Sequence, residues 1–167
     1  MRLGIRSIIF TVTFPGVGIL LIPYLILHIS DSLTAPEYSP VSLFGIALWA
    51  FSVVCLLHCI RGFTRYGRGT LAPVAPPKYL VVQGVYRYTR NPMYLAVLGA
   101  LVSEAMIFRS FGIFIYSFMA FVLFHLFVVY YEEPKLSSAF GVSYEKYRSA
   151  VPRWGMRVRP YVPNRTV

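Results

Sequence analysis

Two short charged segments hold most of the residues in this chain that could do chemistry. The first, residues 84–96, reads GVYRYTRNPMYLA and places two arginines and Asn91 directly before an apolar run. The second is the carboxylate pair Glu132 and Glu133, which follows a later apolar run. A helix start flanked by arginines suits a carboxylate or a phosphate, whereas paired carboxylates suit a cation or the two hydroxyls of a ribose. Together the segments suit a zwitterionic ligand that contains a ribose.

The composition indicates the medium in which these segments act. The chain has 167 residues, of which 57% are hydrophobic and 13% charged, and its mean hydropathy is +0.62. Such a chain is too apolar for a soluble domain and too long for a single membrane anchor. A net charge of +10 could indicate nucleic acid, but the Lys and Arg residues fall almost entirely between apolar runs. The sequence therefore predicts an integral membrane protein with no nucleic-acid partner.

Apolar runs at residues 7–28, 41–60, 92–108 and 111–131 predict an all-α, polytopic transmembrane bundle of about four spans. Basic residues outside these runs number two before the first, none after it, six after the second, one after the third and seven after the fourth. By the positive-inside rule, both termini and the loop after the second run lie in the cytoplasm. The charged segments then share one side of a multi-pass protein.

The third and fourth runs are predicted to form a tight helical hairpin, because only Arg109 and Ser110 separate them. Asn91 is expected to be the N-cap of the third helix, with Pro92 at its first position. At about 1.5 Å per residue, Asn91 lies about 27 Å from the turn and Glu132 about 33 Å. The two charged segments are therefore expected to meet at the cytoplasmic interface.

The rest of the chain divides around this hairpin. Apolar residues at helical spacing between 136 and 151 predict one C-terminal helix that lies along the interface. The chain is interpreted as a single membrane domain, 1–167. Its parts are two N-terminal spans (1–60), a cytoplasmic loop (61–91), the helical hairpin (92–133) and a cytoplasmic interfacial tail (134–167).

Polar residues inside the apolar runs have ordinary structural explanations. Cys55, His58 and Cys59 have i, i+3 and i+4 spacing but no second group of ligands nearby, so no metal site is predicted. An intramembrane carboxylate is a functional candidate by default. Glu104, however, lies four residues before the end of the third run, where we expect it to reach water. His125 is expected to make a polar contact between helices.

The order and spacing of the charged segments resemble a known pattern over residues 66–154. It consists of Gly-x-Tyr, Arg-His/Asn-Pro-x-Tyr, a helix, a Glu-Glu pair, and Phe-Gly-x-x-Tyr-x-x-Tyr ending near Val-Pro-Arg. This pattern is similar to that of the membrane methyltransferases of the isoprenylcysteine carboxyl methyltransferase and phospholipid methyltransferase superfamily. The matching residues are Gly84, Tyr86, Arg90, Asn91, Pro92, Tyr94, Glu132, Glu133, Phe140, Gly141, Tyr144, Tyr147, Pro152 and Arg153.

The resemblance implies an S-adenosylmethionine-dependent methyltransferase with a lipophilic or membrane-embedded acceptor and membrane lipids around it. By analogy, residues at the start of the third helix would hold the amino acid end of the cofactor. The glutamate pair would hold its amino or ribose groups. The implied cofactor residues are Arg90, Asn91, Pro92, Tyr94, Glu132 and Glu133.

Catalytic roles follow from the same analogy. Arg153 would orient an anionic or phosphate-bearing acceptor. A carboxylate acceptor needs no general base, whereas an amine or thiol needs a proton acceptor, for which Glu133 and Tyr86 are the candidates. The Pro-rich loop 73–77 is expected to add part of a lid. The acceptor, and the choice between N-, O- and S-methylation, stay open.

The chain departs from the family pattern at two positions. Asn91 replaces the histidine of better-known members, so its role must be hydrogen bonding, and Ala96 stands where many members have glycine. Both departures argue against a prenylcysteine acceptor more than against the implied cofactor.

Two other functions stay open at this stage. Membrane reductases of the sterol type share a related hairpin and bind NADPH, although they usually have more spans and a glutamate pair suits a cationic cofactor better. The second is a noncatalytic scaffold, in which Arg87 and Arg90 contact lipid phosphates and the glutamates pair with them.

Overall fold

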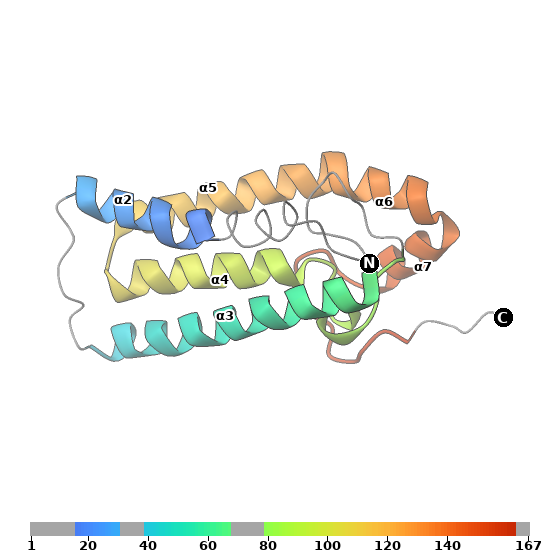
Figure 1. Ribbon diagram of the computed structural model, residues 1–167, viewed down its shortest axis with the longest axis horizontal. Coiled ribbons are helices and arrows are strands. Elements are labelled where there is room, and N and C mark those ends of the chain that lie inside the picture. The colour runs from blue at the N-terminus through green and yellow to red at the C-terminus, as the bar shows by residue number, and fades with distance from the viewer. Residues whose placement is uncertain (1–15, 31–38, 68–78, 163–167) are drawn as a thin grey trace.

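The computed structural model describes residues 16–30, 39–67 and 79–162, and the regular structure within them is entirely helical (Figure 1). The predicted all-α class is therefore confirmed for this part of the chain. The elements are the π-turn η1 (Val17–Leu21), α2 (Ile22–Ile29), α3 (Pro40–Gly67), the 3-10 turn η2 (Gly84–Arg87), α4 (Pro92–Ile107), α5 (Phe111–Phe127), the π-turn η3 (Val128–Glu132), α6 (Glu133–Phe140) and α7 (Val142–Ala150).

Within the described residues, two helices are long and apolar enough to cross a membrane, Pro40–Gly62 and Phe111–Phe140. The helices Val17–Ile29 and Pro92–Ile107 are apolar but shorter. Four spans therefore stay a prediction. The second and fourth runs were predicted to end near residues 60 and 131, and both helices continue further. Polar residues at the interface extend a helix as readily as apolar ones, so hydropathy marks the apolar part and not the helix end.

Helix α4 lies between α3 and α5, with α2 against α5 (Figure 1). The contact between α3 and α4 is close because glycine stands at the crossing. A Cβ on Gly45 of α3 would lie 3.0 Å from Ile107 and 3.1 Å from the Ser103 carbonyl oxygen of α4. Small residues that let backbones approach are the usual means by which helices associate in lipid.

The turn between α4 and α5 directs both helices back to the same end of the molecule (Figure 1). Arg109 adopts a left-handed backbone with φ 49°, and the Ser110 N–H donates to the Ala105 carbonyl at 3.0 Å. The Ser110 side chain then caps α5 by accepting a hydrogen bond from the Ile113 N–H at 3.3 Å. The start of α4 consequently lies near the end of α5.

The predicted single helix between residues 136 and 151 is wrong, because α6 and α7 are two helices separated at Gly141. This glycine has φ 49° and ψ −127°, a backbone that residues with a Cβ rarely adopt. The break turns α7 back, so that Tyr144 and Tyr147 are buried in a cluster that includes Leu80. Apolar spacing alone did not reveal the break, since the spacing continues across it.

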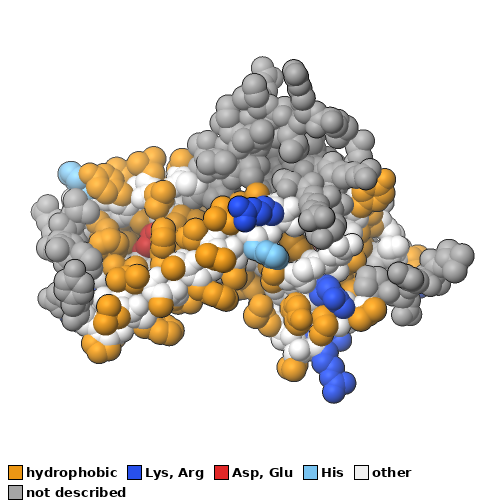
Figure 2. Space-filling view, turned by 60° about the horizontal axis from the view of Figure 1, so that its bottom comes forward, with side chains coloured by type: hydrophobic (Ala, Val, Ile, Leu, Met, Phe, Trp, Pro, Cys, Tyr) orange, Lys and Arg blue, Asp and Glu red, His pale blue; other side chains and the backbone are white. Residues whose placement is uncertain are grey.

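Hydrophobic side chains cover the part of the surface formed by the long helices. In Figure 2 they dominate the left half of the described residues, whereas the Lys and Arg side chains lie toward the middle and right. Exposed aromatic residues include Phe44 and Phe51 on α3 and Phe111 and Phe118 on α5. Lipid contact explains such a large apolar surface.

Candidate functional site

Backbone hydrogen bonds join the loop before α4 to the segment that follows α7, residues 151–162, which is called the tail from here on. The Arg90 N–H donates to the Pro152 carbonyl at 3.0 Å, and the Tyr161 N–H donates to the Arg87 carbonyl at 2.9 Å. Arg87 Nε in turn donates to the Tyr161 carbonyl at 2.7 Å. Arg87 therefore holds the tail in place, which gives it a structural partner other than a lipid phosphate.

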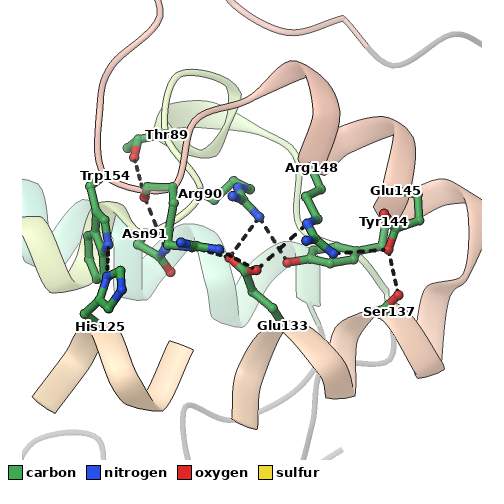
Figure 3. Close-up of polar contacts among 11 residues, drawn as sticks. Thr89, Arg90, Asn91, His125, Glu133, Ser137, Tyr144, Glu145, Arg148 and Trp154 are labelled. Atoms are coloured by element: carbon green, nitrogen blue, oxygen red, sulfur yellow. Dashed lines mark hydrogen bonds and ion pairs between the residues drawn. The ribbon is translucent and has the colours of Figure 1, made fainter. Parts of the chain in front are cut away.

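Asn91 occupies the N-cap position of α4, with Pro92 following, but its side chain makes no capping bond among the described residues. The prediction that Asn91 is the N-cap and Pro92 the first residue of this helix is confirmed. Asn91 Nδ2 instead donates to the Arg153 carbonyl at 3.1 Å, and Thr89 Oγ1 donates to the same oxygen at 3.4 Å (Figure 3). The Asn91 amide therefore acts as a hydrogen-bond donor to the segment after α7, which agrees with the hydrogen-bonding role expected for this residue.

Glu133 stands at the centre of an arginine cluster (Figure 3). Arg153 donates to it through Nε at 2.6 Å and Nη2 at 2.9 Å, a bidentate pair. Arg90 Nη1 lies 3.0 Å from the same carboxylate and Arg148 Nε lies 3.9 Å from it. The Glu133 side chain is only 7% exposed. One carboxylate thus faces three guanidinium groups, which leaves an excess of positive charge around it.

Three ionisable side chains in or near this cluster have raised pKa values. The hydrogen bond to Glu133 raises the pKa of Arg153. Burial raises the pKa of Tyr144, whose hydroxyl accepts a hydrogen bond from Arg90 Nη1 at 3.3 Å. Burial also raises the pKa of Tyr86 well above its usual value. A phenol that stays protonated is a poor proton acceptor, so Tyr86 is a weaker candidate for a general base than a carboxylate.

Glu132, the neighbour of Glu133, has a different partner. Tyr94 donates its hydroxyl to Glu132 Oε2 at 3.0 Å. The Tyr94 ring packs against Phe124 with ring centroids 4.9 Å apart, and Trp154 meets it edge-on at 6.3 Å. The two adjacent glutamates consequently have separate environments: an aromatic one for Glu132 and a cationic one for Glu133.

The π-turn η3 leads directly into these carboxylates. It adds one residue to the helix, so everything after it is rotated by about 100° relative to an uninterrupted α-helix. The rotation decides which way Glu132 and Glu133 face. Nothing in the run VVYYE indicates this turn from the sequence.

The sequence reasoning missed Trp154 and Arg148 as members of the site. Trp154 Nε1 donates to His125 Nδ1 at 2.9 Å, and its ring lies 5.4 Å from that of Phe121. The expectation that His125 would contact another helix is therefore wrong, because its partner belongs to the tail. The position of Trp154 directly after Arg153 was the available signal, but an aromatic residue in a tail has many other uses.

Glu104 does not reach water as expected. Its side chain is buried, and Trp49 Nε1 of α3 donates to its Oε1 at 3.0 Å. The reason is that α4 is central, so even its last turn is covered. No group of three potential metal ligands occurs among the described residues. The predicted lid at 73–77 lies outside them.

The fold and this site define a helical membrane protein with a charged cluster where the start of α4, the end of α5 and the tail converge. A family model described as phospholipid methyltransferase matches residues 40–143, and the chain belongs to this family. The resemblance inferred from the sequence is thereby confirmed. No curated protein and no solved structure gives a significant match.

Membership of this family points to a membrane methyltransferase, and the family normally uses S-adenosylmethionine. The matched segment contains the start of α4 and both glutamates. Arg148, Arg153 and Trp154 follow the matched segment. Arg153 was expected from the pattern in the sequence, whereas the structure alone places Arg148 and Trp154 in the cluster.

Proposed function

We propose that this protein is a multi-pass, S-adenosylmethionine-dependent methyltransferase that acts on a lipophilic or membrane-embedded acceptor at the cytoplasmic membrane face. One observation carries the proposal. The Tyr94–Glu132 pair lies directly beside the Arg90–Glu133–Arg153 cluster, in a chain of the phospholipid methyltransferase family. This juxtaposition offers both charge signs to a single ligand.

The residues present fit the carboxylate end of the cofactor. Arg90 Nε is buried and has no hydrogen-bond partner in the described part of the chain. Leaving such a donor unsatisfied costs about 1–3 kcal/mol, which an anionic partner would recover. The start of α4 at Asn91 and Pro92, which the Asn91 side chain does not cap, also favours an anion. We assign Arg90 and this helix start to the cofactor carboxylate.

The aromatic side of the site fits a cation. Tyr94, Phe124 and Trp154 bring aromatic rings next to the Glu132 carboxylate. Ring faces and a carboxylate together stabilise a sulfonium or ammonium group. We therefore assign Tyr94 and Glu132 to the cationic end of the cofactor. Glu133, whose oxygens are taken up by arginines, is assigned to positioning Arg90 and Arg153.

S-adenosylmethionine, when bound, supplies a methyl group on a sulfonium centre. The protein then has to exclude water, align the acceptor and, for an amine or thiol, accept a proton. Glu132 is the preferred base, because the oxygens of Glu133 are paired with Arg153 and Arg90, and the raised pKa of Tyr86 disfavours a phenolate. The aromatic environment favours an acceptor whose product is a cation, such as an amine.

Calorimetry on the purified protein in detergent tests the proposal. S-adenosylmethionine and its demethylated product should bind, and Arg90→Ala should weaken both. The excess of positive charge around Glu133 is the one observation that favours NADPH and a reductase. Binding of NADPH alone would establish that alternative, and binding of none of the three would favour the scaffold.

A further inference from the structure

The three arginines around Glu133 differ in how far their donors are used. Arg153 uses Nε and Nη2 in its bidentate bond to Glu133, and Arg90 contacts both Glu133 and Tyr144. Arg148 lies 3.9 Å from Glu133 and 3.7 Å from Glu145, distances too long for hydrogen bonds. Its side chain is 45% exposed, against 10% for Arg90 and 28% for Arg153. Arg148 is thus the most exposed of the three arginines.

The donor geometry of Arg148 suits a phosphate. A guanidinium has five N–H donors in a planar fork, and the Arg148 side chain makes only the two long ion pairs to Glu133 and Glu145 within the described residues. Its neighbour Glu145 is half exposed and already accepts a hydrogen bond from Ser137 Oγ at 2.7 Å. The fork is exposed, it lies too far from both carboxylates for hydrogen bonds, and Arg90 and Arg153 share Glu133 with it. A guanidinium with unused donors is suited to bidentate phosphate binding.

The position of Arg148 connects this phosphate to the reaction. Glu133, its partner at 3.9 Å, directly follows Glu132, the carboxylate assigned to the cationic end of the cofactor. Both glutamates lie in the last part of the candidate span Phe111–Phe140. Headgroup phosphates lie where the spans leave the apolar core. A phosphate on Arg148 would therefore hold the rest of a headgroup near Glu132.

We propose that Arg148 binds the phosphate of a phospholipid acceptor and thereby determines which acceptors the enzyme accepts. This inference rests on the proposed methyltransferase function and refines it. It also moves the acceptor-orienting role from Arg153, the residue implied by the family pattern, to Arg148. Arg153 keeps a different task, since its fork is occupied by Glu133.

Binding measurements in a phosphate-free maltoside detergent test this assignment. The full-length protein is titrated with dihexanoylphosphatidylethanolamine, with dihexanoylglycerol, which has the same chains but no phosphate, and with inorganic phosphate. The variants are Arg148→Gln, Arg148→Lys and Lys146→Gln. Lys146 is an exposed cation on the same helix, so its variant controls for the loss of one charge.

Arg148→Gln should weaken binding of the phospholipid by about tenfold or more, the usual effect of losing a charged hydrogen bond. Arg148→Lys should restore part of the affinity, because the charge returns without the fork. Lys146→Gln should leave affinity unchanged within about twofold. Binding of dihexanoylglycerol should be the same in all variants.

Equal phospholipid affinity in wild type and Arg148→Gln would overturn the assignment. Inorganic phosphate that binds as tightly as the phospholipid would overturn it as well, since the site would then serve a free anion. Titration of the same samples with S-adenosylmethionine separates the two proposals. Failure of the wild type to bind the cofactor refutes the methyltransferase function, while the phospholipid titrations still test Arg148.

Discussion

Neutralising Glu133 should destabilise the protein far more than neutralising any exposed glutamate. In Glu133→Gln the amide replaces a carboxylate that is 7% exposed and faces three arginines. Removing one member of a buried ion pair typically costs 3–5 kcal/mol, because the other charge is left uncompensated. Arg153 and Arg148 are partly exposed and are free to turn to water, so Arg90, 10% exposed, carries most of the cost. We expect a loss of about 2–4 kcal/mol in unfolding free energy.

Glu145→Gln is the matched control, because Glu145 is 51% exposed and its ion pair with Arg148 is long at 3.7 Å. Exposed pairs of this kind contribute about 0–1 kcal/mol. Denaturant unfolding in detergent, followed by circular dichroism, measures both variants under the same conditions.

A double-mutant cycle then identifies the charge responsible. Arg90→Met should cost less in the Glu133→Gln background than in the wild type, because the uncompensated guanidinium is gone. The reasoning is refuted if Glu133→Gln costs no more than Glu145→Gln, or if the two changes at Glu133 and Arg90 are additive.

Two further predictions concern the aromatic side of the site and the helix crossing. Tyr94→Phe should weaken S-adenosylmethionine binding about tenfold in calorimetry, since Glu132 loses a hydrogen bond. Tyr130→Phe, at an exposed tyrosine, is the control and should leave the affinity unchanged. Equal cofactor affinity in the two variants would contradict the assignment of Tyr94. Gly45→Ala should lower unfolding free energy by about 1–3 kcal/mol, because its Cβ meets Ser103 and Ile107 of α4. Gly62→Ala, on the same helix but with open space around it, should be neutral or stabilising, because alanine favours a helix more than glycine does. A comparable loss there would contradict the assignment of the Gly45 effect to packing against α4.

The proximity of the two charged segments could be predicted from the sequence because it depends on simple geometry. A helix rises by a constant amount per residue, and a two-residue connection forces its neighbours to return. The distance from the turn to Asn91 and to Glu132 therefore follows from counting. The structure accordingly brings Tyr94 to Glu132 and Arg90 to Glu133.

The partners of individual side chains were not accessible in the same way. Asn91 bonds the Arg153 carbonyl and His125 accepts from Trp154, and both partners belong to the tail. The expected partners were inferred from the helix start and from the neighbouring helices alone. A tail that folds back offers further hydrogen-bond partners, which such reasoning does not include. The burial of Glu104 has the same origin, because coverage by α3 depends on how the helices pack.

The tail explains why the site has two distinct carboxylates rather than one acidic patch. Its backbone joins the loop before α4 through Pro152 and Tyr161, and this brings Arg153 to Glu133 and Trp154 to Tyr94. Arg153 takes up the charge of Glu133, and Trp154 contributes an apolar wall beside Tyr94 and Glu132. Adjacent like charges would otherwise disfavour each other's ionised form. The tail thus neutralises one carboxylate and leaves the other in an aromatic environment, which suits the cationic ligand proposed for Glu132, while Glu133 holds the arginines in place.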